Sequence, residues 1–231
     1  MSDLSLLDEI PDPVEPPQTA HVAGEVRAPL PASPAPTRST SERRKLAALG
    51  VSAAWLFTHL CVYGIRQDFH ALPAGYVAAQ VLLPFVFGAC CLAVALAPGK
   101  LGLGVGVAVV SAMALLGPLS FWVLALGMPA PHPPAPSPFG FWLGSLLCLD
   151  ITLSWAAAPL LLIALSLRRA FATQAVWRST LVGAAIGLLS GGAINMHCSN
   201  VHPWHLLAGH AVPVVLAALL GAGLVVKWTR A

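Results

Sequence analysis

The chain has 231 residues, of which 57% are hydrophobic and only 9% are charged, and its formal net charge is +3. Soluble domains carry about 25% charged residues, so this composition excludes an ordinary soluble globular protein. After Lys45, nine Asp, Glu, Lys or Arg residues separate apolar runs of roughly 20 residues, the length that a helix needs to cross a bilayer. The sequence therefore predicts an all-α membrane protein, a six-transmembrane-helix bundle with a disordered cytoplasmic N-terminal tail.

Residues 1–45 form the predicted tail, which is rich in Pro, Ala, Ser and Thr and is assigned to partner binding. Its first 26 residues hold six acidic side chains and no Lys or Arg. Between Ser2, a candidate N-cap, and Pro11, a stop, apolar side chains recur at helical spacing. The candidate partner-binding residues are Leu4, Leu6, Leu7, Asp8, Glu9 and Ile10. The alternative is a disordered acidic tail whose leucines have no shared role.

The predicted transmembrane domain, residues 46–231, contains six apolar spans: 46–65, 76–97, 101–127, 139–167, 180–196 and 206–226. Eleven of the twelve Lys and Arg residues lie in the two tails or in the second and fourth connectors. Because Lys and Arg accumulate on the cytoplasmic side of membrane proteins, we expect both termini to be cytoplasmic and the connector before the sixth span to lie outside.

Two polar side chains fall inside the predicted spans. An intramembrane carboxylate costs at least about 2.5–3.5 kcal/mol unless it is paired or protonated. We therefore expect Asp150, in the fourth span, to face the bundle interior in a neutral or hydrogen-bonded form, with His59 of the first span as a candidate partner. The alternative is a proton relay or ion pathway, which would need more such groups on other helices. In the fifth span, Gly183, Gly187 and Gly191 recur every four residues, a pattern that favours close packing of helix backbones.

The connector before the sixth span and the start of that span are dense in side chains that bind metals or are oxidised. The candidates for sensing are His197, Cys198, His202, His205 and His210. If the sixth span starts near Pro203, His202 and His205 share a helical face. A metal ion in this loop would use His197, Cys198, His202 and His205. The alternative is an interfacial belt, since His and Trp suit the headgroup boundary.

Catalytic motifs are missing from the sequence, which has no P-loop, no nucleotide-binding fingerprint, no Ser/His/Asp arrangement and no paired carboxylates. We therefore predict a protein without enzymatic activity and without a cofactor, apart from a candidate metal ion at the outer loop. An acidic inner tail joined to an outer His/Cys loop fits a device that couples an outside event to an inside partner.

The stretch from residue 146 to the end resembles a known family. It has a Cys before a long fourth span (Cys148), a Leu-Arg-Arg turn (167–169), a Gly/Ala-rich fifth span (183–192) and a His-Cys pair (197–198). This layout resembles the NrsF-type bacterial anti-sigma factors, which are six-pass inner-membrane proteins. It is also similar to the membrane anti-sigma factors that control light-induced carotenoid synthesis. The first three spans share only the layout.

The resemblance implies a bacterial inner-membrane protein whose tail sequesters an extracytoplasmic-function sigma factor and releases it on a stress or light signal. By position, it makes Cys148 and Cys198 the stress-sensing candidates. The expected partners are this sigma factor and membrane lipid, with no direct contact to nucleic acid. The family has acidic residues after its His-Cys pair, where this chain reads SNVHPWH, so the resemblance implies nothing about the other residues of the loop.

A second hypothesis, from a different class, is a metal- or heme-handling membrane transporter or sensor that uses the outer His/Cys loop. It predicts that the purified protein retains metal through the loop and that deletion of the tail leaves function intact. The anti-sigma factor hypothesis instead makes the tail essential.

Overall fold

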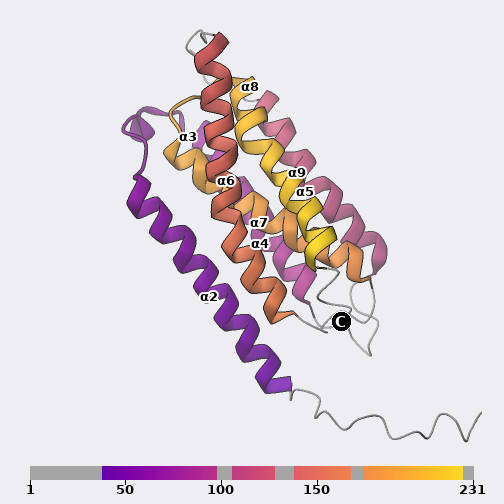
Figure 1. Ribbon diagram of the computed structural model, residues 1–231. Helices are drawn as coiled ribbons and strands as arrows, with labels where there is room; N and C mark the ends of the chain where they lie inside the picture. The colour runs from indigo at the N-terminus through magenta and orange to yellow at the C-terminus, as the bar shows by residue number, and fades with distance from the viewer. Residues whose placement is uncertain (1–37, 98–105, 128–137, 168–173, 226–231) are drawn as a thin grey trace, which may run out of the picture. The chain divides into compact units, whose positions relative to one another are not determined.

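The computed structural model describes residues 38–97, 106–127, 138–167 and 174–225, and the structural statements below concern these residues. The candidate partner-binding residues 4–10, and the disorder predicted for them, lie outside the described residues. Within the described ranges the chain is helical and contains no strand (Figure 1). The elements are α2 (Arg38–Tyr63), η2 (Phe69–Ala71), α3 (Ala74–Val77), η3 (Ala78–Leu82), α4 (Leu83–Leu96), α5 (Val107–Gly127), α6 (Pro138–Ser166), α7 (Ala175–His197), α8 (Pro203–His205), η5 (Leu206–Ala211), α9 (Val212–Leu220) and η6 (Gly221–Val225).

Six of the described helices are long and apolar enough to cross a membrane: Lys45–Tyr63, Ala74–Leu96, Val107–Gly127, Phe141–Ser166, Ala175–His197 and Pro203–Gly223. Each overlaps one of the predicted spans, so the six-helix, multi-pass architecture is confirmed. The largest difference is at the start of α2, which extends back to Arg38. The polar sequence there contains no Gly or Pro, and Lys45 Nζ lies 3.3 Å from Glu42 Oε1, one turn away.

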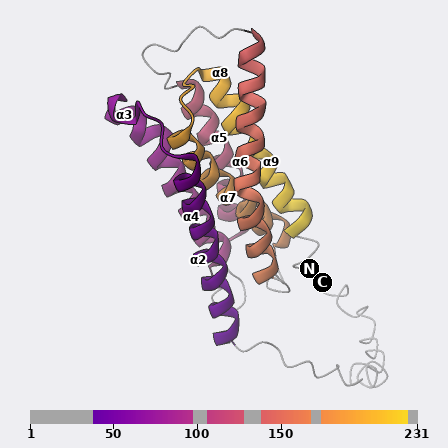
Figure 2. The ribbon, with the colours of Figure 1, turned by 60° about the vertical axis from the view of Figure 1, so that its left-hand side comes forward.

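The helix α7 lies among the other described helices (Figures 1 and 2). It contacts α2, α4, α5, α6 and α9, and 83% of an apolar 18-residue stretch within it is buried. Its first turns carry Arg178, whose Nη1 donates to the carbonyl oxygens of Ala95 and Ala97 at 3.1 Å each. These carbonyls end α4, where an arginine is favourable because the last carbonyls of a helix lack partners.

The glycine repeat of α7 allows α9 to approach closely. A Cβ atom on Gly187 would lie 2.8 Å from the Cα of Val214, and one on Gly183 would collide with the carbonyl oxygen of Ala217. At Gly191 a Cβ would lie 3.0 Å from an aromatic ring of α5. Real Cβ atoms essentially never approach backbone closer than 3.0 Å, so glycine is needed at positions 183 and 187, and the predicted packing role of this repeat is confirmed.

The prediction that Asp150 faces the bundle interior is wrong. Asp150 is exposed on α6, whereas Ser145, Thr152 and Trp155 of the same helix are buried. Five helical residues turn the chain by about 500°, so Asp150 and Ser145 point about 140° apart. The half-buried ring of His59, its proposed partner, packs against Trp155, with ring centroids 5.4 Å apart.

Candidate functional site

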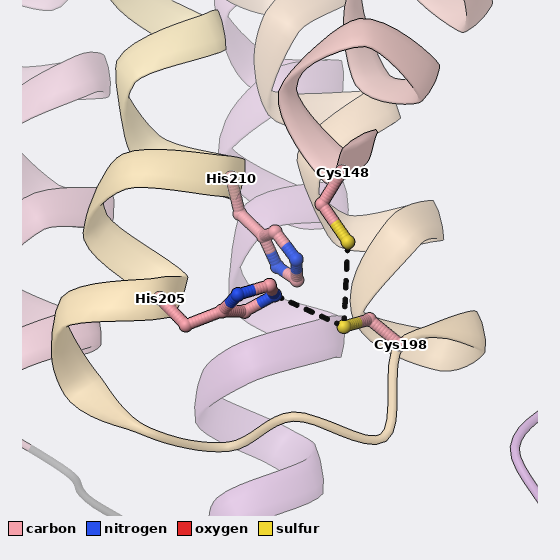
Figure 3. A group of neighbouring side chains, drawn as sticks. All are labelled: Cys148, Cys198, His205 and His210. Carbon is pink, nitrogen blue, oxygen red and sulfur yellow. Dashed lines mark hydrogen bonds between the residues drawn. The ribbon is translucent and has the colours of Figure 1, made fainter. Parts of the chain in front are cut away.

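Four side chains that are far apart in the sequence meet beside the end of α7. They are Cys148, Cys198, His205 and His210, and we call them the Cys/His centre. Each offers one ligand atom, and the four atoms all lie within 4.8 Å of one another. Figure 3 shows Cys148 reaching in from α6, Cys198 from the loop after α7, and both histidines from the following helical segment. The centre therefore joins three parts of the fold.

The end of α7 positions Cys198. This residue caps the helix with an extended backbone, and its N–H still donates to the carbonyl oxygen of Ile194 at 2.8 Å. The chain then crosses to α8, which begins at Pro203, a residue suited to the first turn of a helix because its missing N–H would have no partner there. This short loop places the Cys198 thiol next to the residues of α8 and η5.

The two histidines come together because the chain between them is a π-helix. In an α-helix, residues five apart point about 140° away from each other. In η5 the hydrogen bonds run between residues five apart, so such residues come nearly into line along the axis. The rings of His205 and His210 accordingly lie with their centroids 5.2 Å apart.

The η5 segment also lies tightly against α6. A Cβ on Gly209 would lie 3.0 Å from the Cβ of Cys148 and 3.2 Å from the carbonyl oxygen of Ser145. Pro213 has no N–H to donate to the carbonyl of Gly209, four residues earlier. The hydroxyl of Thr152 donates to the carbonyl oxygen of Cys148 at 2.6 Å and also lies 3.4 Å from the carbonyl oxygen of Gly209. Glycine and threonine together allow the contact between the two helices at the level of the centre.

The hydrogen bonds inside the centre run through Cys198. The thiol of Cys148 donates to the Cys198 sulfur at 3.5 Å, and Nε2 of His205 lies 3.2 Å from the same sulfur (Figure 3). The other ring nitrogen of His205, Nδ1, lies 3.1 Å from the hydroxyl oxygen of Ser145. The Cys148 and His205 hydrogen bonds lower the pKa of Cys198 below that of an ordinary thiol, although burial acts in the opposite direction.

His210 is held by a buried polar network. Its Nδ1 is hydrogen-bonded to Oδ1 of Asn195, while Nδ2 of Asn195 donates to the carbonyl oxygen of Gln80 at 2.6 Å. Nε2 of Gln80 in turn donates to the carbonyl oxygen of Leu124 at 2.6 Å. Because Oδ1 of an amide can only accept, Nδ1 of His210 carries the proton. Its Nε2 then has a lone pair, and this buried atom has no hydrogen-bond partner among the described residues.

The loop that carries Cys198 is tied to the end of α2 by Arg66. Its Nη1 donates to the carbonyl oxygen of Cys198 at 2.9 Å, and its Nη2 donates to that of Ser199 at 3.2 Å. The same guanidinium makes a paired contact with Asp68, with both nitrogen–oxygen distances at 2.7 Å. This hydrogen-bonded cation lowers the pKa of the Asp68 carboxyl. The buried Arg66 therefore links the first connector to the loop of the Cys/His centre.

The structure brings together some of the sensing and metal-binding residues predicted from the sequence and separates others. Cys148, Cys198, His205 and His210 meet, but His197 and His202 do not join them. Nδ1 of His197 lies 3.1 Å from the carbonyl oxygen of Gly64. His202 precedes α8 in an extended conformation, and its ring packs against Phe141 with centroids 5.8 Å apart. The metal ligand set predicted from the loop alone is thus changed in two of its four members.

Two half-buried cysteine sulfurs and two buried imidazoles have two chemical options. They can bind a metal ion that prefers sulfur and nitrogen ligands, or the two sulfurs can be oxidised to a disulfide. The 3.5 Å between the sulfurs is well beyond the roughly 2.05 Å of a disulfide bond, and both cysteines are free. No protein-family model, curated protein or solved structure matches this chain. The site is therefore supported by its own geometry.

Proposed function

We propose that this chain is a membrane-bound anti-sigma factor of the NrsF type. In this proposal, the N-terminal tail sequesters an extracytoplasmic-function sigma factor at the bacterial inner membrane, and both termini are cytoplasmic. A stress or light signal at the Cys/His centre releases the sigma factor. The proposal includes no enzymatic step. The observation that carries it is the contact between Cys148 and Cys198, 50 residues apart in sequence and 3.5 Å apart at their sulfurs.

The position of this contact suits a sensor because it joins two elements that are far apart in the sequence. Cys148 belongs to α6, and Cys198 belongs to the loop that ends α7. The helix α2 packs against both α6 and α7, through a hydrophobic cluster that includes Leu56 of α2, Trp155 of α6 and Ile194 of α7. Since α2 continues directly from the tail at Arg38, a change in the α6–α7 contact has a physical route to the segment that binds the partner.

The charge and the apolar residues of the tail suit it to bind a sigma factor. Sigma factors bind DNA and are basic, so an acidic segment with a short apolar stripe is a suitable ligand for them. The stripe consists of Leu4, Leu7 and Ile10, with Leu6 beside it. A short helix of this kind is marginal in isolation and gains stability when it folds into a groove on its partner.

The experiment is co-purification of the tagged full-length protein from membranes of its source organism, with sigma factors identified by mass spectrometry. We expect an extracytoplasmic-function sigma factor with the unaltered protein and none with Leu4→Asp/Leu7→Asp. The matched control is Val14→Asp/Val22→Asp, which changes the charge equally outside the predicted helix and should retain the partner. Retention of the sigma factor by Leu4→Asp/Leu7→Asp would contradict docking through this helix.

A second candidate function, the metal- or heme-handling transporter, is favoured by the same Cys/His centre. Among the residues that the structure describes, the packing beyond the centre argues against a transporter. Past the Asn195–Gln80 network, the interior around α7 is filled by small and aliphatic side chains, including Val182, Ile186 and Leu188. A transported cation would need polar ligands along this path. Deletion of residues 1–37 separates the two functions, because a transporter would keep its activity.

A further inference from the structure

We propose that the Cys/His centre is a closed tetrahedral zinc site. Its ligands are the sulfurs of Cys148 and Cys198 and the Nε2 atoms of His205 and His210. The proposal concerns the centre alone and does not depend on a sigma factor as the partner. Two thiolates balance the charge of one Zn²⁺ ion, so the assembly is neutral, which reduces the cost of placing a divalent cation inside the protein.

The distances between ligand atoms fit this coordination. With Zn–S bonds of about 2.3 Å and Zn–N bonds of about 2.0–2.1 Å, a tetrahedron separates two sulfurs by about 3.8 Å and a sulfur from a nitrogen by about 3.6 Å. The sulfurs of Cys148 and Cys198 are 3.5 Å apart, and the Cys198 sulfur is 3.2 Å from Nε2 of His205. All four ligand atoms fall within 4.8 Å. The two distances that involve the Cys198 sulfur therefore lie within about 0.4 Å of the tetrahedral values.

Both histidines have the support that metal-bound histidines usually have. A ligating imidazole generally donates its other N–H to a neighbouring acceptor, which fixes the ring and its tautomer. Here Nδ1 of His205 lies against the hydroxyl oxygen of Ser145, and Nδ1 of His210 against Oδ1 of Asn195. Nε2 of His210 is buried without a hydrogen-bond partner among the described residues. A buried acceptor without a partner is costly, and a metal ion in the centre would remove this cost.

The ligand chemistry selects zinc. Two sulfurs and two nitrogens in a tetrahedral arrangement suit Zn²⁺, whereas Cu²⁺ favours a tetragonal arrangement of nitrogen and oxygen ligands, and Ca²⁺ and Mg²⁺ favour oxygen. Four protein ligands leave no position for water or substrate, which is the pattern of a structural rather than a catalytic zinc ion. The ion would therefore hold α6, the loop after α7 and η5 together.

The test is metal analysis of the full-length protein, purified in detergent under reducing conditions from cells supplied with zinc. We expect stoichiometric zinc in the unaltered protein, measured by inductively coupled plasma mass spectrometry. Cobalt-exchanged protein should show the intense visible absorption of tetrahedral Co²⁺ together with sulfur-to-cobalt charge transfer. This measurement uses the unaltered chain and so does not depend on whether a variant folds.

Substitutions assign the ligands. Cys148→Ala and His210→Ala should each abolish stoichiometric zinc, while His202→Ala and Cys61→Ala, which change a histidine and a cysteine outside the centre, should keep it. Asn195→Leu removes the acceptor on Nδ1 of His210 and should weaken zinc affinity by about 10- to 100-fold. The proposal is overturned by a protein that is zinc-free although both thiols are reduced, by an octahedral cobalt spectrum, or by equal loss of zinc in His202→Ala.

Discussion

The helices α7 and α2 are both apolar, but they differ in how much of their surface is buried in the bundle. Of the six long apolar helices among the described residues, α7 has the lowest hydropathy, yet 83% of an 18-residue stretch within it is buried, compared with 17% of such a stretch in α2. In α2 large apolar residues such as Leu46, Phe57 and Val62 are exposed. In α7 the close contacts are made at glycines. Hydropathy therefore does not determine which of these two helices is buried, because lipid is as apolar as leucine and close packing favours helix association.

The largest effect should come from placing a methyl group on the buried face of α7. Gly187→Ala puts a Cβ within 2.8 Å of Val214, and overpacking of this kind costs about 1–3 kcal/mol. Thermal unfolding in detergent should show the loss. The matched control is Gly50→Ala in α2, where a Cβ meets nothing within 4 Å and alanine is the better helix former. Equal unfolding temperatures for the two variants would break the comparison between the helices.

A smaller effect is expected where η5 meets α6. Gly209→Ala would press a methyl group against Cys148, 3.0 Å away, and move the sulfur from its partners, at a cost of about 1 kcal/mol. The zinc retained during dialysis against a chelator should fall. Gly144→Ala is the control on α6, because a Cβ there would lie 3.9 Å from the nearest atom, on His205. Unchanged zinc retention in Gly209→Ala would show that this close contact is not needed by the centre.

Arg66 ties the end of α2 to the loop after α7, so it tests whether the two regions are coupled. Arg66→Ala removes the hydrogen bonds to the carbonyls of Cys198 and Ser199, and we expect a loss of about 1 kcal/mol. Hydrogen exchange measured by mass spectrometry should rise in residues 197–202. If exchange there is unchanged, the connection through Arg66 contributes nothing measurable to the order of the loop.

The smallest effect should be the pH dependence of the Arg66–Asp68 pair. Arg66 lowers the pKa of Asp68, so the pair adds stability above the unfolded-chain pKa of about 3.9. This stability is lost as the pH falls through the lower pKa of the folded chain. The Asp68 side chain is 52% exposed, so the contribution stays below about 1 kcal/mol. Asp68→Asn should reduce the drop in unfolding temperature between pH 6 and pH 3, and an identical drop would contradict a role for the pair.

The six spans and the packing role of the α7 glycines could be predicted because both depend on local pattern. A run of apolar residues sets the length of a span, and a repeat of small residues every four positions lies on one helical face. The end of each span was less predictable. The polar start of α2 at Arg38, for example, continues a helix past the apolar region that hydropathy detects.

The composition of the Cys/His centre could be predicted only in part. The resemblance singled out Cys148 and Cys198, and the density of the loop singled out His205 and His210. The sequence could not exclude His197 and His202, because the choice depends on the π-helical geometry of η5, which aligns residues five apart. The one available signal for the π-helix was Pro213, which has no N–H to donate to the carbonyl oxygen of Gly209. The outward position of Asp150 likewise depends on which face of α6 meets α7.

The central claim, that the tail captures a sigma factor, is tested most directly by removing residues 1–37 from the tagged protein. This deletion ends just before α2 and leaves the described unit intact. We predict that the shortened protein elutes as a single species on size-exclusion chromatography but carries no sigma factor, whereas the full chain carries one. A sigma factor that still co-purifies with the shortened protein would contradict the account.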